Sequence, residues 1–274
     1  MGISAPDFAY VRGLVRQRSA IDLQPGKEYL VESRLISVAR AAGADDLSSL
    51  VSRIRAGDER LQEAVVDAMT TNETSWFRDV HPFDAFTSQL LPEIATTSQS
   101  KEIVVWSAGC STGQEAYSLA MLLLDWLPAH PGFGARIIGT DISRSVIERA
   151  QRARYSQLEV NRGLRAPQLV AHFDQVGRDW VLREQVRRLC RFQQGNLVEP
   201  LLGLPMCDVV FLRNVLIYFD LDTKRAVLAN VRTVLRPGGF LVLGGAESTL
   251  NLDAVFERLE LGRAVVFRHT GGTR

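Results

Sequence analysis

Small and acidic residues follow two predicted strands in the middle of the chain, and their spacing suits a nucleoside ligand. An apolar strand at 103–106 leads into Ala108-Gly109-Cys110-Ser111-Thr112-Gly113, and a helix is predicted from Gln114 to Leu127. A second strand, 136–140, ends at Asp141. In a Rossmann-like sheet the loop after the first strand lies against an adenosine, and an acid after the second binds the ribose hydroxyls. The sequence therefore predicts a nucleoside cofactor.

The glycines of this loop help to choose between cofactors. Dinucleotide sites favour G-x-G-x-x-G, whose backbone N–H groups approach a pyrophosphate, whereas here only Gly109 and Gly113 are present. S-Adenosylmethionine carries an ammonium, a carboxylate and a sulfonium but no phosphate, so a loop followed by Glu115 suits it better. The alternative is structural: the two glycines only allow a helix and a strand to pack closely.

Two further strand ends carry polar side chains. Asn196 follows a predicted strand, and its amide can donate to and accept from the adenine edge. The buried strand 207–212 leads to Asn214 and Tyr218. Ligands of open α/β sheets bind beyond these strand ends, so Asn214 and Tyr218 are expected to face the same crevice as Asp141.

The segment 69–79 is chemically denser than a linker requires. It contains hydroxyls, an amide, two aromatic rings and the guanidinium of Arg78. We expect it to cover the cofactor. The alternative is that Thr71, Asn72 or Thr74 caps a helix while Trp76 and Phe77 enter the core.

The first 70 residues are predicted to form a helical module. Helices are expected at 8–18, 27–42 and 47–56 and again after Asp58, from apolar residues at helical spacing and from caps and glycines between them. Lys27 and Arg34 flank the apolar stripe of the second helix, either as a solvated edge or as a surface that faces a partner.

The remaining pattern sets the domain boundaries. A connecting helix, 81–91, is expected to stop at Pro92, and the polar loop 95–100 precedes the first strand. We predict a helical N-terminal domain at 1–70, a connecting segment over the cofactor at 71–95 and a Rossmann-like α/β domain at 96–274. An arginine-rich insertion at about 173–194 is expected to contain antiparallel strands at 179–183 and 186–192, which either offer a basic edge to a peptide or serve only the fold. A strand at 264–268 is predicted as an antiparallel edge.

Composition excludes several classes of protein. The 274 residues have a net charge of +1, which argues against bulk electrostatic binding to nucleic acid or membrane. The three cysteines form no C-x-x-C pair, so neither a disulfide framework nor a metal site is predicted. No apolar run approaches the roughly 18 residues of a membrane span, and no signal sequence is seen. A cytoplasmic location is expected.

Five motifs together closely resemble the CheR family of chemotaxis receptor methyltransferases. They are Thr70 to Arg78, Trp106 to Ser118, Gly139 to Ile142, Arg213 to Phe219 and Leu235 to Gly239. The resemblance implies a Rossmann-like, class I S-adenosylmethionine-dependent methyltransferase sheet with a small all-helical N-terminal domain and an inserted antiparallel β sub-domain. It implies transfer of a methyl group to glutamate side chains on the cytoplasmic helices of chemoreceptors.

The resemblance also assigns residues. The positions that match the family's cofactor contacts are Asn72, Thr74, Arg78, Glu115, Asp141, Asn196, Leu197, Asn214 and Val215. The family faces its receptor through the second helix, and the matching residues here are Lys27, Arg34 and Arg40.

The implied reaction requires no catalytic His or Cys. A glutamate with an unperturbed pKa near 4.3 is already an anion at neutral pH and can attack the sulfonium methyl directly. Holding the reacting atoms in line can contribute about 7 to 11 kcal/mol at best. Arg78 is a candidate to orient the carboxylate or to close over the cofactor, and Tyr218 could donate a hydrogen bond to the same oxygens.

One segment departs from the family pattern. Some members bind a receptor C-terminal peptide through a glycine-containing loop of the β sub-domain, but here the stretch 173–180 is short and glycine-poor. The chain is therefore expected to act without that tether. The alternative functions are a methyltransferase of the same fold with another substrate and a non-catalytic signalling adaptor; the loop disfavours an NAD-dependent dehydrogenase.

Overall fold

The computed structural model describes residues 2–98 and 100–271, so Gln99 of the predicted polar loop lies outside it. The chain divides into two compact units. One comprises the residues up to Thr71 together with Tyr218–Thr223, and the other comprises Asn72–Ile217 and the residues from Lys224 onwards.

The first unit contains the four helices that the apolar spacing predicts. They are α1 Ala5–Ser19, α2 Glu28–Ala41, α3 Leu47–Arg55 and α4 Glu59–Met69. The side chains of Ser4, Asp46 and Asp58 each accept a hydrogen bond from a backbone N–H in the first turn of α1, α3 and α4, respectively. Val31 and Leu35 of α2 are fully buried in the core of this unit.

Arg34 of α2 has a structural role in this unit. Its guanidinium donates to the carbonyl oxygens of Met69 (2.7 Å) and Thr70 (3.0 Å) and to the hydroxyl of Thr71 (2.9 Å). The last carbonyls of a helix have no partner within the helix, and a cation is favoured beside them. Arg34 therefore fixes the C-terminal end of α4.

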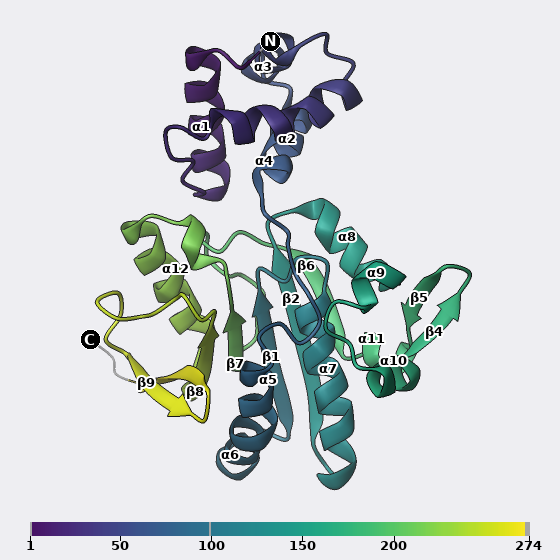
Figure 1. The fold of residues 1–274 in the computed structure, drawn as a ribbon. Coiled ribbons are helices and arrows are strands. Elements are labelled where there is room, and N and C mark those ends of the chain that lie inside the picture. The colour runs from purple at the N-terminus through teal and green to yellow at the C-terminus, as the bar shows by residue number, and fades with distance from the viewer. Residues whose placement is uncertain (1, 99, 272–274) are drawn as a thin grey trace. The chain divides into compact units, whose positions relative to one another are not determined.

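The second unit is built on a seven-stranded sheet with the order β6-β2-β1-β7-β8-β10-β9 (Figure 1). The strands are β1 Glu102–Ala108, β2 Gly134–Asp141, β6 Cys190–Gln194, β7 Cys207–Leu212, β8 Leu235–Leu243, β9 Phe256–Leu261 and β10 Ala264–His269. The first five strands in this order run parallel, and β10 pairs antiparallel with both β8 and β9. This is the predicted α/β class. The antiparallel pairing of β10 was predicted, but the edge strand is β9, which the sequence pattern did not reveal.

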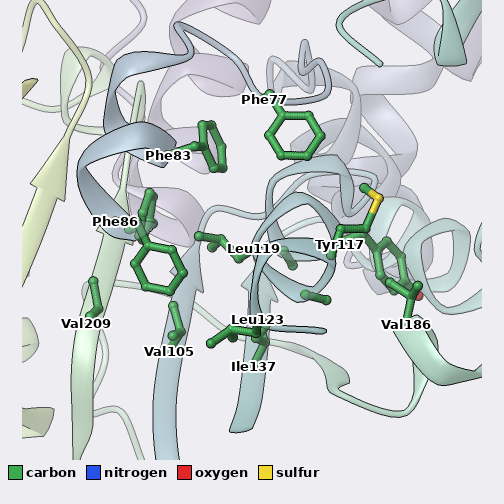
Figure 2. Close-up of a cluster of buried hydrophobic side chains, with 14 of the residues drawn as sticks. Phe77, Phe83, Phe86, Val105, Tyr117, Leu119, Leu123, Ile137, Val186 and Val209 are labelled. Atoms are coloured by element: carbon green, nitrogen blue, oxygen red, sulfur yellow. The ribbon is translucent and has the colours of Figure 1, made fainter. Parts of the chain in front are cut away.

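Helices cover the sheet and complete its core. The main ones are α5 His81–Ala85, the π-helix η1 Phe86–Leu90, α6 Leu91–Thr97, α7 Gln114–Trp126, α8 Arg144–Arg152 and α12 Leu221–Val234. Short helical segments are η2 Leu127–Ala129, α9 Gln157–Val160, α10 Ala166–His172, α11 Glu184–Arg187 and η3 Leu216–Tyr218. Figure 2 shows Phe86 of η1 and Leu119 of α7 in one buried cluster with Val105 of β1.

Two local predictions were wrong. Pro92 does not stop the connecting helix, because it lies in the first turn of α6, where a missing N–H costs little. Residues 186–192 do not form a strand of the insertion; the chain there passes from α11 into β6, which pairs in parallel with β2.

The antiparallel sub-domain is present. β3 Arg154–Ser156, β4 Phe173–Val176 and β5 Asp179–Leu182 form a three-stranded sheet with the order β3-β5-β4. The β4–β5 hairpin extends away from the main sheet (Figure 1).

Trp76 anchors the segment that leads into the α/β unit. Its ring is 1% exposed and makes edge contacts with Tyr155 and Phe173. The backbone N–H of Trp76 donates to the carbonyl of Arg162 at 3.0 Å. Gly163 follows with φ +111°, and a Cβ there would lie 2.0 Å from the Trp76 carbonyl oxygen, so this close approach requires glycine.

We predict that Gly163→Ala destabilises the protein by about 2–4 kcal/mol, because it adds a clash to an unfavourable backbone conformation. Gly132→Ala is the matched control: its φ is +93° but nothing lies within 4 Å of the added Cβ. The control should cost about 1 kcal/mol. Urea denaturation measures both, and equal losses for the two variants would refute the proposed contact.

Candidate functional site

The loop between β1 and α7 is bonded to the end of β2. The N–H groups of Gly109 and Cys110 both donate to the carbonyl of Thr140, at 2.8 and 2.9 Å. Gly109 has φ +75°, and a Cβ there would lie 2.5 Å from a methyl of Val215. Gly109 thus permits the loop to lie against a predicted cofactor contact, whereas Gly113 serves close packing, since its Cβ would lie 3.0 Å from the side chain of Ala150.

Asp141 is held at the carboxyl end of β2 by backbone groups. Its two oxygens accept from the N–H groups of Ser111 (2.9 Å) and Ser143 (3.0 Å), and the residue is 9% exposed. Each carboxylate oxygen has a second acceptor site. The side chain can therefore keep this orientation and still accept hydrogen bonds from ribose hydroxyls.

Cys110 lies in the same loop but is not a nucleophile. Burial raises the pKa of its thiol well above the usual value, and the charges of Asp141 and Glu115 raise this pKa further. The thiol stays protonated at neutral pH, and only a thiolate is a good nucleophile.

Glu115 lies in the first turn of α7 with both oxygens engaged. One accepts from the hydroxyl of Ser107 at 2.8 Å, and the other accepts from the guanidinium of Arg213 at 3.0 Å. A carboxylate in the first turn is favoured by the helix dipole. Arg213 follows β7 and begins one of the five motifs, but the sequence pattern does not reveal its role.

Asn214 and Val215 are positioned by Glu247, which sequence reasoning missed. Their N–H groups donate to its two carboxylate oxygens at 2.7 and 2.9 Å, and the N–H of Gly244 donates at 2.8 Å. Asn214 has φ +60°, a conformation that asparagine tolerates better than most residues. The available signal was an acid four residues beyond the end of β8.

Asn196 follows β6, as predicted. Its Nδ2 donates to Glu199 at 3.1 Å, and the carbonyl of the neighbouring Leu197 accepts from Asn230 at 2.9 Å. The N–H of Gly195 donates to the carbonyl of Asp141 at 2.9 Å. The amide of Asn196 is thus carried on backbone that is bonded to the end of β2.

The segment 72–79 is tied to the loop after β1. The hydroxyl of Ser111 donates to the carbonyl of Asn72 at 2.7 Å, and the N–H of Phe77 donates to Ser118 of α7 at 3.1 Å. Arg78 is half-buried and donates to the carbonyl of Glu73 at 3.2 Å. The alternative for this segment was a helix cap at Thr71, Asn72 or Thr74 with Trp76 and Phe77 in the core. Trp76 and Phe77 are indeed buried, but residues 71–75 are not helical.

A cavity of about 490 Å³ adjoins this segment. It is lined by Asn72, Glu73, Thr74, Thr112, Gln114, Ser145, Val146, Arg149, Arg152, Glu159 and Arg162. Two predicted cofactor contacts, Asn72 and Thr74, are among these residues, whereas Glu115, Asp141 and Asn214 are not.

Tyr218 lies at the end of η3 and is half-buried. It belongs to the helical unit, and its carbonyl accepts from the N–H of Asp22 at 3.1 Å. Its predicted place beside Asp141 stays a prediction.

Comparison with known proteins covers both units. Residues 72–265 match the family model described as CheR methyltransferase, SAM binding domain, and residues 6–70 match CheR methyltransferase, all-alpha domain. The chain is 36% identical to chemotaxis protein methyltransferase 1 of Pseudomonas aeruginosa, over 98% of this chain and 99% of that protein. It is 38% identical to chemotaxis protein methyltransferase 1 of Vibrio cholerae, over 97% and 98%, and 35% identical to Cher2 of Pseudomonas putida, over 96% and 97%.

We predict that Asp141→Asn weakens binding of S-adenosylhomocysteine about 10- to 100-fold, because an amide NH₂ would replace one of the two acceptors that the backbone N–H groups and the ribose require. Calorimetric titration measures the dissociation constant. Asp174→Asn, at a 63% exposed carboxylate in β4, is the control. Equal affinities of Asp141→Asn and the control would contradict the ribose assignment.

Proposed function

Since the chain belongs to the CheR family of S-adenosylmethionine-dependent chemotaxis protein methyltransferases, we propose which of its residues bind the cofactor and which act in the transfer of a methyl group to glutamate side chains of chemoreceptors. The proposed cofactor contacts are the nine positions assigned by resemblance. The observation that best supports them is that Ser111 bonds to both Asn72 and Asp141. This one residue links the segment 72–79 to the proposed ribose-binding acid.

The chemistry needs positioning rather than acid–base catalysis. S-Adenosylmethionine supplies an electrophilic methyl carbon on a sulfonium. A glutamate carboxylate of the receptor is the nucleophile; an O–C bond forms as the C–S bond breaks, and no proton is transferred. We propose that Asp141 and Asn196 bind the nucleoside and that Glu115 lies beside the ammonium group of S-adenosylmethionine.

Arg78 is proposed to bind the cofactor rather than the attacking carboxylate. A tight ion pair with that carboxylate would stabilise the ground state, and only interactions that strengthen in the transition state accelerate the reaction. Tyr218 is proposed as a hydrogen-bond donor to the incoming glutamate.

We propose that the second helix of the N-terminal unit faces the receptor, with Lys27 and Arg40 as the contacting cations. Both are exposed, whereas the guanidinium of Arg34 is engaged at the end of α4.

The β4–β5 turn is only Gly177-Arg178, so we further propose that no receptor tail peptide is required. In residues 2–98 and 100–271, no helix has the length and apolar character to cross a bilayer.

The direct test of the function is transfer of labelled methyl groups from S-adenosylmethionine to a chemoreceptor cytoplasmic fragment. Glutamyl methyl esters release methanol in mild base, so the expected label is base-labile and volatile. Replacing the receptor's glutamates with alanine should abolish it. Cofactor binding without transfer to any receptor would favour an adaptor, and base-stable label would indicate another substrate group.

We predict that Arg78→Ala raises the dissociation constant for the cofactor about tenfold, because a charge-assisted hydrogen bond is lost, and that turnover at saturating cofactor falls less than threefold. Separate calorimetry and single-turnover measurements distinguish the two effects. A large fall in turnover with unchanged affinity would instead assign Arg78 to the attacking carboxylate.

We predict that Arg40→Glu raises KM for the receptor several-fold, more strongly at low salt, because an exposed charge acts on association. Its loss of stability should stay below about 1 kcal/mol, the cost of an exposed anion in the last turn of α2. Arg34→Ala should lower the stability by about 1–3 kcal/mol, since the α4 carbonyls lose their donor. A loss of stability in Arg40→Glu as large as that expected for Arg34→Ala, or no loss in Arg34→Ala, would reverse these assignments.

A further inference from the structure

We propose that Arg213 is a positioning residue: it fixes the backbone of Arg78 and Asp79 relative to Glu115 and thereby sets the affinity for the cofactor. This inference rests on the proposed cofactor contacts of Glu115 and Arg78. It adds a residue that was not among those contacts.

The guanidinium of Arg213 has three partners. Its Nη1 donates to Glu115 at 3.0 Å, and its Nη2 donates both to the carbonyl of Arg78 at 2.9 Å and to the carboxylate of Asp79 at 2.6 Å. The partners come from the first turn of α7 and from the segment 72–79, while Arg213 itself follows β7. One side chain therefore joins three separate parts of the α/β unit.

Burial makes these contacts obligatory. The Arg213 side chain is 1% exposed, so its charge has lost its water and must be compensated by the two carboxylates. Its Nε is buried and has no hydrogen-bond partner among the residues that the structure describes, and the Phe83 ring lies 5.6 Å from the guanidinium carbon. The guanidinium is therefore held by its Nη groups alone. A lysine could not reproduce this fork, because it presents a single ammonium group.

The backbone that Arg213 holds is strained. Phe77, Asp79 and Val80 have φ values of 47°, 67° and 51°, although none is glycine. A β-branched residue such as Val80 rarely adopts such a conformation. Strain of this kind persists only where surrounding contacts maintain it. The bonds from Arg213 to the Arg78 carbonyl and to Asp79 are contacts of this kind, so the place of the Arg78 side chain depends on them.

Asp79 offers the cleanest test, because its side chain is 56% exposed and Glu115 still compensates the charge of Arg213 when the charge of Asp79 is removed. Asp79→Asn removes the charge but keeps the shape. We expect its dissociation constant for S-adenosylhomocysteine, measured by calorimetry, to rise about 5- to 20-fold, while kcat at saturating S-adenosylmethionine stays within about threefold. Asp84→Asn is the matched control: that carboxylate is 69% exposed, and its Oδ2 lies 3.8 Å from Nδ1 of His81. It should bind as the wild type does.

A double variant separates positioning from a general structural effect. If Asp79 acts by placing Arg78, then Asp79→Asn added to Arg78→Ala should have no further effect on affinity, and the two changes should be non-additive. Arg213→Lys should weaken binding at least as much as Asp79→Asn, because it also disturbs the bonds to Glu115 and to the Arg78 carbonyl. Wild-type affinity in Asp79→Asn, or additive losses in the double variant, would overturn the proposal. Failure of the wild type itself to bind would instead count against the proposed cofactor site.

Discussion

Parallel pairing of β1 with both β2 and β7 is the constraint on which the site depends. The register places Ala108 opposite Thr140, so the loop after β1 meets the end of β2, and the Thr140 carbonyl accepts from Gly109 and Cys110. The chain after β7 emerges at the same edge, where Arg213 reaches the first turn of α7. Because the carboxyl ends of parallel strands coincide, residues far apart in sequence converge at this edge of the sheet.

The site is built from carboxylates fixed by backbone and arginine donors. Asp141 accepts from two backbone N–H groups and Glu247 from three, and Glu115 is bound by Arg213. Such groups are pre-oriented before a ligand arrives, which suits a reaction that requires alignment and no proton transfer. Phe77, Asp79 and Val80, on either side of Arg78, have positive φ values. Such strained backbone persists only where surrounding contacts hold it, and here the hydrogen bonds from Arg213 to the Arg78 carbonyl and to Asp79 are such contacts.

Local pattern predicted much of this architecture, and long-range contacts account for what it did not predict. The helices of the first unit and the strand that ends at Asp141 follow from apolar spacing. The roles of Arg213 and Glu247 could not be seen, because their partners lie elsewhere in the chain and a lone charge at a strand end has many possible uses. Strand β6 was misplaced because a short apolar run does not reveal which sheet it joins. Arg34 looked like a surface cation because helical spacing gives its direction but not its partner at the end of α4.

The central claim is that the methyl donor lies across the ends of β2, β1 and β7 and is covered by the segment 72–79. A crystal structure with S-adenosylhomocysteine tests it most directly. The account predicts ribose hydroxyls on Asp141, adenine beside Asn196 and Leu197, and the amino-acid end of the ligand near Glu115 and Asn214. A nucleoside confined to the cavity between Thr74 and Arg152, with no contact to Asp141, would contradict it.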